Sequence, residues 1–332
     1  MEVTKHTVLI TGGTGSFGHK FVEKALKSDK YSRIIVFSRD EMKQFYMAEK
    51  FGADARLRFF IGDVRDQQRL ERALQGVDVV IHAAATKIVP TAEYNPSECI
   101  KTNILGAMNL IEALHNSSVS KVVALSTDKA SSPINLYGAT KLASDKLFIS
   151  ANLYSGKKHK LSVVRYGNVM GSRGSIIPFF QRQLEKKQPL TITDERMTRF
   201  MISLDEAVEM VADALEDMEG GELYVRKIPS MNIIDILRTI EPEADYKVIG
   251  IRPGEKLHEQ MISVEESRFT YEYQHYFKVL PDLNNWSTDP KFVKGGRKVD
   301  AGFSYTSDNN SEWMSRAQLS AWVKENTGRL IY

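Results

Sequence analysis

The chain has 332 residues, of which 42% are hydrophobic and 26% are charged, so it is long enough to bury a large core and to carry a second lobe. Its 45 basic and 42 acidic residues nearly cancel, and no block of like charge occurs, which argues against a nucleic-acid partner or a polybasic membrane contact. The single cysteine, Cys99, cannot form an internal disulfide, and the N-terminus lacks the pattern of a signal peptide. Since no apolar run approaches the roughly 20 residues of a membrane span, we expect a cytoplasmic protein without membrane segments.

Short β-branched runs alternate with amphipathic segments through the first half of the chain. This order predicts an α/β fold, a doubly wound parallel sheet of the Rossmann type. After a further strand-like run at 161–169 the pattern loosens, with helices expected over 176–187 and 204–218. We therefore predict a dinucleotide-binding domain over 1–168 and a smaller mixed α/β substrate lobe over 169–332, some of whose segments return to the sheet. The expected strands are 6–11, 33–38, 56–62, 77–84 and 121–127, and the expected helices between them are 21–28, 68–75 and 102–116.

The first predicted strand runs directly into TGGTGSFG, residues 11–18, which has the spacing G-x-x-G-x-x-G. Glycines in such a turn let the backbone approach a pyrophosphate, and the amides at the start of the following helix then bind its charge. A glycine turn also serves as a plain connection between strand and helix. Its place after a strand and before an apolar helix pattern favours dinucleotide binding through Gly12, Gly15 and Gly18.

The end of the second predicted strand indicates which dinucleotide is bound. An acidic residue there would hold the ribose 2′-hydroxyl of NAD, whereas Ser38 and Arg39 offer a small donor and a cation suited to a 2′-phosphate. Lys43 adds a second cation if a helix starts here, while Asp40 is the one feature that fits NAD. We predict NADP. Asp63 follows the third strand and fits either an adenine contact or a helix cap.

The stretch STDKASSPINLYGATK, residues 126–141, carries the candidate catalytic groups. On a helix, Tyr137 and Lys141 lie on one face, where the lysine and a cationic nicotinamide favour the tyrosine anion needed to take a proton from a hydroxyl. Thr127 follows the fifth strand and can bond to the same hydroxyl. These three residues account for removal of a hydride from a secondary alcohol.

Asp128 and Lys129 are not needed for that oxidation. A ketone on one sugar carbon acidifies the proton on the neighbouring carbon, so a base there can remove it while an acid protonates an adjacent departing hydroxyl. An Asp-Lys pair can also be part of an ordinary polar loop. Beside Tyr137, the pair predicts an elimination of water.

The chain resembles the extended short-chain dehydrogenase/reductase family, and within it the UDP-N-acetylglucosamine 4,6-dehydratases that invert C5 and begin pseudaminic acid synthesis. The resemblance covers essentially the whole chain and rests on TGGTGSFG, STDKA…NLYGATKLASDKLF, RYGNVMGSRGSIIPFF, TDERMTRFMISL and IGIRPGEKLHE. Thr86 and Ile88, which flank Lys87, depart from the residues more usual in this group. Tyr137 agrees with the tyrosine-bearing branch rather than with relatives that carry methionine there.

The resemblance implies a role for each candidate. Tyr137, Lys141 and Thr127 would support hydride transfer from sugar C4 to tightly bound, recycled NADP+, Asp128 would protonate the departing C6 hydroxyl, and Lys129 would take the C5 proton. The implied cofactor residues are Gly12, Thr14, Gly15, Ser16, Phe17, Gly18, Ser38, Arg39, Asp40, Lys43, Asp63, Val64, Ala83, Lys87, Tyr137 and Lys141, with no metal. The implied residues for UDP-N-acetylglucosamine are Lys87, Asn168, Arg173, Pro178, Thr193, Arg199, Arg252 and Glu255.

Two other functions fit parts of the pattern. A UDP-hexose 4-epimerase would use the same Thr127, Tyr137 and Lys141 without needing Asp128 and Lys129. A non-catalytic NADP sensor would bind cofactor but generally lacks an intact Tyr-x-x-x-Lys. Related enzymes pair through two helices beside the sheet, here expected within 97–116 and 136–154, so we expect a homo-oligomer, a dimer that could assemble further into a hexamer.

Overall fold

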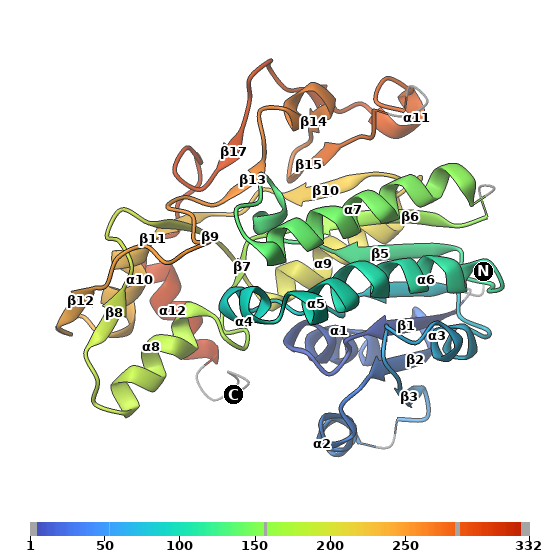
Figure 1. The fold of residues 1–332 in the computed structure, drawn as a ribbon, viewed down its shortest axis with the longest axis horizontal. Helices are drawn as coiled ribbons and strands as arrows, with labels where there is room; N and C mark the ends of the chain where they lie inside the picture. The colour runs from blue at the N-terminus through green and yellow to red at the C-terminus, as the bar shows by residue number, and fades with distance from the viewer. Residues whose placement is uncertain (1–4, 53, 156–157, 283–285, 327–332) are drawn as a thin grey trace.

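The computed structural model describes residues 5–52, 54–155, 158–282 and 286–326. Its centre is a ten-stranded sheet in the order β16-β14-β15-β10-β6-β5-β4-β1-β2-β3 (Figure 1). The strands from β3 to β10 in this order are parallel, and β15, β14 and β16 continue the sheet antiparallel. The seven parallel strands are β1 (His6–Thr11), β2 (Tyr31–Ser38), β3 (Leu57–Ile61), β4 (Val79–His82), β5 (Lys121–Leu125), β6 (Lys160–Arg165) and β10 (Leu223–Arg226); the other three are β14 (Thr270–Glu272), β15 (Tyr276–Val279) and β16 (Arg297–Lys298).

Helices cover both faces of the sheet, as a doubly wound fold requires. On one face α3 (Gln67–Ala73) packs on α6 (Gly106–Leu114), and α6 packs on α7 (Leu136–Tyr154); on the other face α1 (Ser16–Leu26) packs on α9 (Leu204–Asp217) (Figure 1). The central strands are apolar because both their faces are covered, and Val8, Leu9 and Ile10 of β1 are fully buried. The predicted fold class is confirmed.

Local sequence explains where the helices begin. Asp40 caps α2 (Glu41–Phe51), Asp66 caps α3, and Asn135 caps α7, each accepting a hydrogen bond from a backbone N–H in the first helical turn. Ser203 opens α9 with a reciprocal capping box that includes Glu206. These caps fix the loops that precede the helices, and the loops before α1, α2 and α7 lie beside the cavity described below.

The remaining elements form a second lobe with its own apolar core. Its sheets are β11-β9-β7 and the parallel pair β12-β8, and a further antiparallel pair, β13-β17, adjoins it. Buried side chains of α8, α10 and α12, such as Phe180, Leu237 and Leu319, pack together in this core. The elements are β7 (Asn168–Val169), α8 (Ile176–Glu185), β8 (Leu190–Ile192), β9 (Thr198–Ile202), β11 (Ser230–Asn232), α10 (Ile233–Ile240), β12 (Tyr246–Val248), β13 (Gln260–Ile262), β17 (Tyr305–Thr306) and α12 (Arg316–Asn326).

The predicted elements agree with the structure except at their ends and at two interruptions. The strand-like run expected at 161–169 is divided into β6 and β7, which belong to different sheets. The strand expected over 6–11 is found at those bounds. The helix expected over 102–116 is instead a π-helical turn, Lys101–Leu105, followed by α6. Two short helices, α4 (Val89–Tyr94) and α5 (Pro96–Ile100), precede that turn. A 3₁₀ turn, Asp128–Ala130, follows β5. A second 3₁₀ turn, Glu266–Phe269, and the short helix α11 (Pro290–Val293) lie near β14 and β15. Of the helices in the described ranges, none combines the length and apolarity needed to cross a membrane.

Candidate active site

A cavity of about 830 Å³ lies at the carboxyl ends of the parallel strands, between the sheet and the second lobe. The residues after β1 and β4 line it, and the strand order reverses between these two strands, because β2 and β3 follow on one side of β1 and β4, β5 and β6 on the other. Such a reversal is the usual ligand site of an open α/β sheet. The loops after β1, β2, β3, β4 and β5 line one part of it, and residues of α8, β8 and the segment 252–259 line another. One cavity therefore brings together the predicted cofactor and substrate residues.

The glycine turn after β1 has the geometry predicted for it. Gly12 has a φ of +64°, and a Cβ there would lie 2.8 Å from the backbone of Ala84. Gly15 and Ser16 line the cavity at the first turn of α1. Gly18 does not line the cavity. A Cβ at this position would lie 2.0 Å from the Gly13 carbonyl oxygen, so Gly18 allows the helix to pack against the turn.

The predicted 2′-phosphate residues lie at the end of β2. Ser38, Arg39, Asp40 and Lys43 all line the cavity. Ser38 Oγ is 2.7 Å from Thr14 Oγ1, which ties this end of the strand to the glycine turn. Asp40 caps α2, and its carboxylate lies 2.8 Å from Lys43 Nζ. The carboxylate therefore already binds protein groups without a cofactor ribose.

Asp63 lines the cavity beside Val64. Its carboxylate binds Arg65 at 2.7 Å and lies 3.5 Å from Arg39. Although burial would raise it, these arginines keep the pKa of Asp63 below its usual value. Asp66, and not Asp63, caps α3, so the helix-cap alternative for Asp63 is wrong.

The candidate catalytic residues meet at the floor of the cavity. Thr127 and Asp128 follow β5 and are 8% and 1% exposed, and Tyr137 and Lys141 face the same space from α7, at 9% and 3% exposure. Burial raises the pKa of Tyr137 to about 12, while the charge of Lys129 and a hydrogen bond with Thr127 act in the opposite direction. Burial also lowers the pKa of Lys141, and the Asp145 carboxylate opposes that change.

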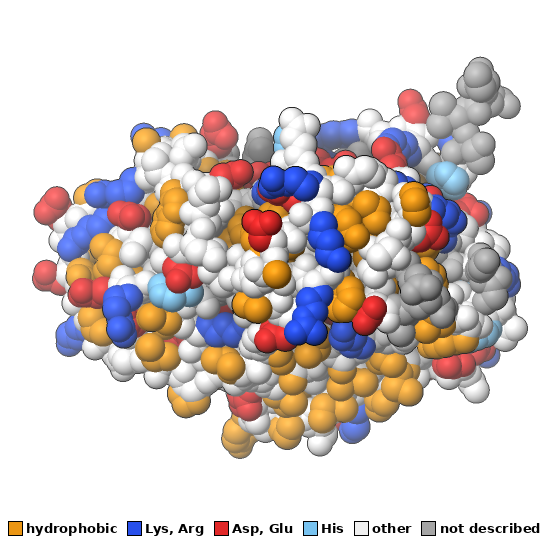
Figure 2. Space-filling model, turned by 90° about the horizontal axis from the view of Figure 1, so that it is seen from above, with side chains coloured by type: hydrophobic (Ala, Val, Ile, Leu, Met, Phe, Trp, Pro, Cys, Tyr) orange, Lys and Arg blue, Asp and Glu red, His pale blue; other side chains and the backbone are white. Residues whose placement is uncertain are grey.

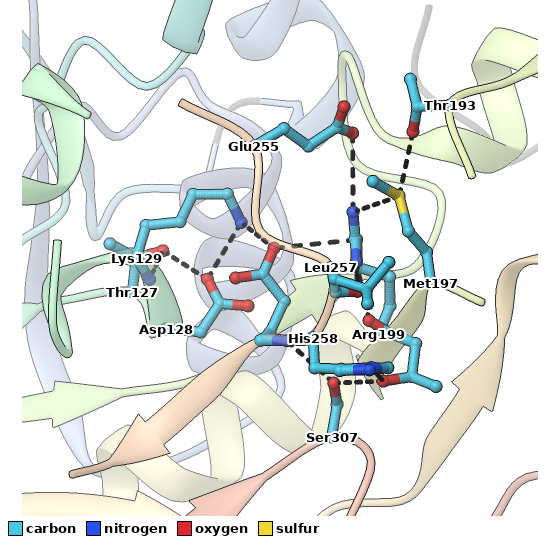
Figure 3. A network of polar contacts seen from close by, with 12 residues as sticks. Thr127, Asp128, Lys129, Thr193, Met197, Arg199, Glu255, Leu257, His258 and Ser307 are labelled. Atoms are coloured by element: carbon cyan, nitrogen blue, oxygen red, sulfur yellow. Dashed lines mark hydrogen bonds and ion pairs between the residues drawn. The ribbon is translucent and has the colours of Figure 1, made fainter. Parts of the chain in front are cut away.

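Lys129 is held between two carboxylates (Figure 3). Its Nζ lies 3.1 Å from Asp128 Oδ1 and 3.1 Å from Oε1 of Glu259, a residue that sequence reasoning did not single out. Burial would lower the pKa of Lys129, but the two carboxylates outweigh it and raise that pKa. Burial, followed by the charge of Glu259, raises the pKa of Asp128. Oδ2 of Asp128 is buried and has no hydrogen-bond partner among the described residues.

The predicted substrate residues line the cavity, with one exception. Pro178 is buried within α8 and does not line the cavity. Lys87 is accessible from the cavity but surrounded by protein, and burial with the charges of Arg173 and Lys129 lowers its pKa. The others that line it are Asn168, Arg173, Thr193, Arg199, Arg252 and Glu255.

The three predicted phosphate-binding arginines differ in what already binds them. Arg252 is exposed, and Nε of Arg173 is buried without a hydrogen-bond partner among the described residues. Arg199 is 6% exposed and fully occupied: Nη1 donates to the carbonyls of Thr198 and Leu257, Nη2 lies near Glu255 and the Met197 sulfur, and Nε lies 3.7 Å from Glu259 (Figure 3). Its contact with a substrate phosphate stays a prediction.

Comparison with known proteins agrees with this geometry. The model of the family described as "Polysaccharide biosynthesis protein" matches residues 8–281. A UDP-N-acetylglucosamine 4,6-dehydratase (inverting) from Campylobacter jejuni subsp. jejuni serotype O:2 is 52% identical over 98% of this chain and 99% of its own. A UDP-glucose 4-epimerase from Rickettsia massiliae is 42% identical over 91% of each chain.

Among solved structures, the X-ray structure of Pen from Bacillus thuringiensis covers 100% of both chains with a TM-score of 0.90 and 34% identity. The family match spans most of the chain, and the relatives span nearly all of it. The chain therefore belongs to the polysaccharide biosynthesis protein family of extended short-chain dehydrogenases/reductases.

Proposed function

We propose that the protein is a UDP-N-acetylglucosamine 4,6-dehydratase that inverts C5 and is the first enzyme of pseudaminic acid synthesis. The product would be UDP-2-acetamido-2,6-dideoxy-β-L-arabino-hex-4-ulose. The observation that carries the proposal is the acid–base pair Asp128–Lys129, 3.1 Å apart, in the same cavity as Thr127, Tyr137 and Lys141. The relatives named as inverting dehydratases, at 51–52% identity, support the substrate and the stereochemistry.

The residues of the cavity fit NADP. Gly12 lets the turn after β1 approach the backbone of Ala84 closely, and the start of α1 at Gly15 and Ser16 lines the cavity, where backbone N–H groups can bind a pyrophosphate. Arg39 and Lys43 can bind a 2′-phosphate. Bound NADP+ would accept the hydride from C4 and supply it to C6, so the reaction needs no external oxidant. Tyr137 would take the C4 hydroxyl proton, with the cationic Lys141 and the oxidised cofactor lowering its pKa from the buried value.

The elimination needs a neutral amine on Lys129 and a protonated Asp128. The ion pair in the structure already holds the same number of protons, because transfer of one proton from Lys129 Nζ to Asp128 Oδ1 across 3.1 Å gives that form without changing the net charge. The raised pKa of Asp128 favours the acid form, whereas the raised pKa of Lys129 favours the ammonium, so the ion pair is the resting form and the proton transfer is uphill from it. Lys129 would then take the C5 proton, and Asp128 would protonate the departing C6 hydroxyl as water leaves.

The substrate diphosphate would be bound by Arg173 and Arg252. Nε of Arg173 is a buried donor that lacks a partner among the described residues, and a phosphate oxygen would satisfy it. Lys87 and Asn168 also line the cavity and would contact the sugar or its phosphate.

The direct test is a proton NMR time course with UDP-N-acetylglucosamine in D₂O. Loss of substrate, a new 6-methyl signal and deuterium at C5 are expected, and the ring couplings should show inversion. Formation of UDP-N-acetylgalactosamine without a methyl signal would instead support a 4-epimerase, which the 42% identical relatives and the shared Thr127, Tyr137 and Lys141 favour as the second candidate. No conversion, even with added NADP+, would overturn both.

Replacing Arg39 with alanine should weaken NADP binding and leave NAD binding unchanged. The guanidinium is 56% exposed at the end of β2, where it would lose one phosphate contact, so we expect the Kd for NADP to rise about tenfold, roughly 1.4 kcal/mol. Calorimetric titration of cofactor-stripped protein with both dinucleotides measures this. Arg33→Ala, at the exposed start of the same strand, is the control. An equal loss for both dinucleotides would contradict the assignment of NADP.

We also propose a homodimer formed through α5, α6 and α7. The exposed apolar side chains Ile100, Leu105, Met108, Leu153 and Tyr154 belong to the π-turn region and these helices. Figure 2 shows hydrophobic side chains gathered along its lower edge, which is the side occupied by these helices at the front of Figure 1. Such a patch on a folded chain is typical of a protein interface.

Light scattering of the wild type should give at least twice the mass of one chain. Met108→Glu should give a monomer, because a charge would be buried in the interface without a partner. Val248→Glu, at an exposed apolar residue of β12, should not change the mass. A wild-type monomer would contradict the proposed dimer.

A further inference from the structure

Glu259 is a buried carboxylate at the wall between the two lobes. It directly precedes β13, and its side chain is 3% exposed. Its backbone is fixed on both sides, since its N–H donates to Ser307 Oγ at 2.9 Å and its carbonyl accepts from the Ser307 N–H at 2.8 Å. Ser307 Oγ in turn lies 2.6 Å from Thr198 Oγ1, which is 2.8 Å from His258 Nδ1 (Figure 3). The segment 258–259 is therefore locked to β9 and to the loop after β17.

The charge of Glu259 is directed at Lys129. Oε1 lies 3.1 Å from Lys129 Nζ and 3.7 Å from Arg199 Nε, and Oε2 has no hydrogen-bond partner among the described residues. Burial would raise its pKa, but Lys129 and Arg199 outweigh it and lower the pKa, so Glu259 stays ionised. Both side chains line the cavity, but that of Lys129 is 25% exposed and that of Glu259 only 3%. A substrate in the cavity would therefore meet mainly the amine.

We propose that Glu259 is a positioning residue for Lys129: it holds the lysine amine beside Asp128 and stabilises the ammonium that forms when Lys129 takes the C5 proton. The inference rests on the proposed dehydratase function and deepens it. Arg199 helps to hold Glu259 in this position, because its nitrogens contact Glu255, Glu259 and two backbone carbonyls.

The C5–H bond breaks, its proton binds the lone pair of Lys129 Nζ, and its electron pair forms the C5–C6 double bond. The C6–O bond breaks with its electrons on oxygen, which leaves as water with the proton of Asp128. Starting from the neutral amine, positive charge develops on Lys129 in a buried site, where the Glu259 carboxylate 3.1 Å away stabilises it without having to reorganise.

A lysine with several free torsions also needs to be held in place. With Asp128 alone, Nζ would have one charged partner, on the adjacent residue of the chain. The second contact, from a carboxylate 130 residues away, fixes the direction in which the amine points. If Glu259 only stabilised the fold, its replacement would lower the Tm and would not slow dehydration more than C4 oxidation.

The test uses Glu259→Gln in the complete, NADP-loaded protein with UDP-N-acetylglucosamine. We expect kcat for dehydration to fall on the order of 10²-fold with KM changed about twofold or less. C4 oxidation precedes the defective step, so reduced cofactor should accumulate and absorb at 340 nm, which the wild type should not show. Glu259→Asp, which keeps the charge, should recover part of the rate.

The pH profile gives a second readout. The groups that act on Lys129 or are acted on by it are Asp128, Glu259, Arg199, Tyr137, Lys87 and Lys256. Because the Glu259 anion raises the pKa of Lys129, its loss should lower that pKa. The alkaline limb of the kcat profile, where the pair loses its shared proton, should therefore move to lower pH.

The matched control is Glu222→Gln, at another buried carboxylate, which accepts hydrogen bonds from Ser162 Oγ and from backbone N–H groups remote from the cavity. It should lower Tm without causing accumulation of reduced cofactor. An unchanged rate in Glu259→Gln, or equal loss of C4 oxidation and dehydration in a folded variant, would overturn the inference. A wild type that forms no 6-methyl product would instead overturn the dehydratase proposal itself.

Discussion

Lys129→Met should greatly slow dehydration while leaving oxidation at C4. Methionine keeps the apolar stem of lysine but has no amine, so nothing in the network can take the C5 proton, and we expect dehydration to slow on the order of 10³-fold. Thr127, Tyr137 and Lys141 are unchanged, so the 4-keto intermediate and reduced cofactor should accumulate. Stopped-flow absorbance at 340 nm detects the cofactor, and NMR in D₂O should show neither a 6-methyl signal nor deuterium at C5.

Two comparisons make this result interpretable. Lys247→Met removes an exposed lysine of β12 and should retain wild-type turnover. The Lys129→Met variant leaves Asp128 and Glu259 close together without the cation between them, so Asp128 should become protonated, and the fold must be checked by Tm with NADP bound. Retention of 6-methyl formation in Lys129→Met would rule out Lys129 as the base.

Gly138→Ala should disable the enzyme even though alanine usually strengthens a helix. In an exposed helix interior this change stabilises by about 1 kcal/mol. Here a Cβ on Gly138 would lie 2.1 Å from the carbonyl oxygen of Lys129 and 3.1 Å from Pro133, a contact that backbone can relieve only by moving. We expect overpacking to cost about 2 kcal/mol in the free energy of unfolding. The displaced Lys129 should also lower kcat on the order of 10²-fold.

Thermal unfolding and turnover of the NADP-loaded variant measure both effects. Ser150→Ala, farther along the same helix, controls for the effect of adding alanine to α7, and it should not lower Tm. A Gly138→Ala protein with wild-type Tm and rate would mean that the close approach of α7 to Lys129 is not required.

The parts of the site that sequence could predict are local ones. The β1 strand, the glycine turn after it and the Tyr137–Lys141 pair each depend on spacing within a few residues, because the geometry of a strand, turn or helix turn fixes that spacing. These segments meet in the structure because the carboxyl ends of parallel strands lie at one edge of a sheet. The sequence left two roles open for Asp63, an adenine contact and a helix cap. The structure shows that α3 begins after Asp66 and that Asp66 caps it.

The contacts that sequence could not predict join distant segments. Glu259 is the last residue of the motif IGIRPGEKLHE, but nothing in its local pattern connects it to Lys129, because the contact depends on how β13 and the loop after β17 dock on the sheet. In the same way, Arg199 could be recognised as a cation but not as one whose nitrogens already have protein partners. Pro178 lies in a predicted motif, yet helix α8 turns it away from the cavity.

The path of the chain limits how the enzyme can be recombined with its relatives. After β6 the chain leaves the sheet, returns through α9 and β10, leaves again for β11 and α10, and returns for β14, β15 and β16. A fragment ending near residue 168 would lack β10 and so expose the backbone edge of β6. Exposed strand edges promote pairing with strands of other molecules. Substrate specificity therefore cannot be transferred between homologues as one contiguous segment. A chimera must exchange at least two separate segments of the second lobe and keep residues 204–226 with the nucleotide-binding sheet.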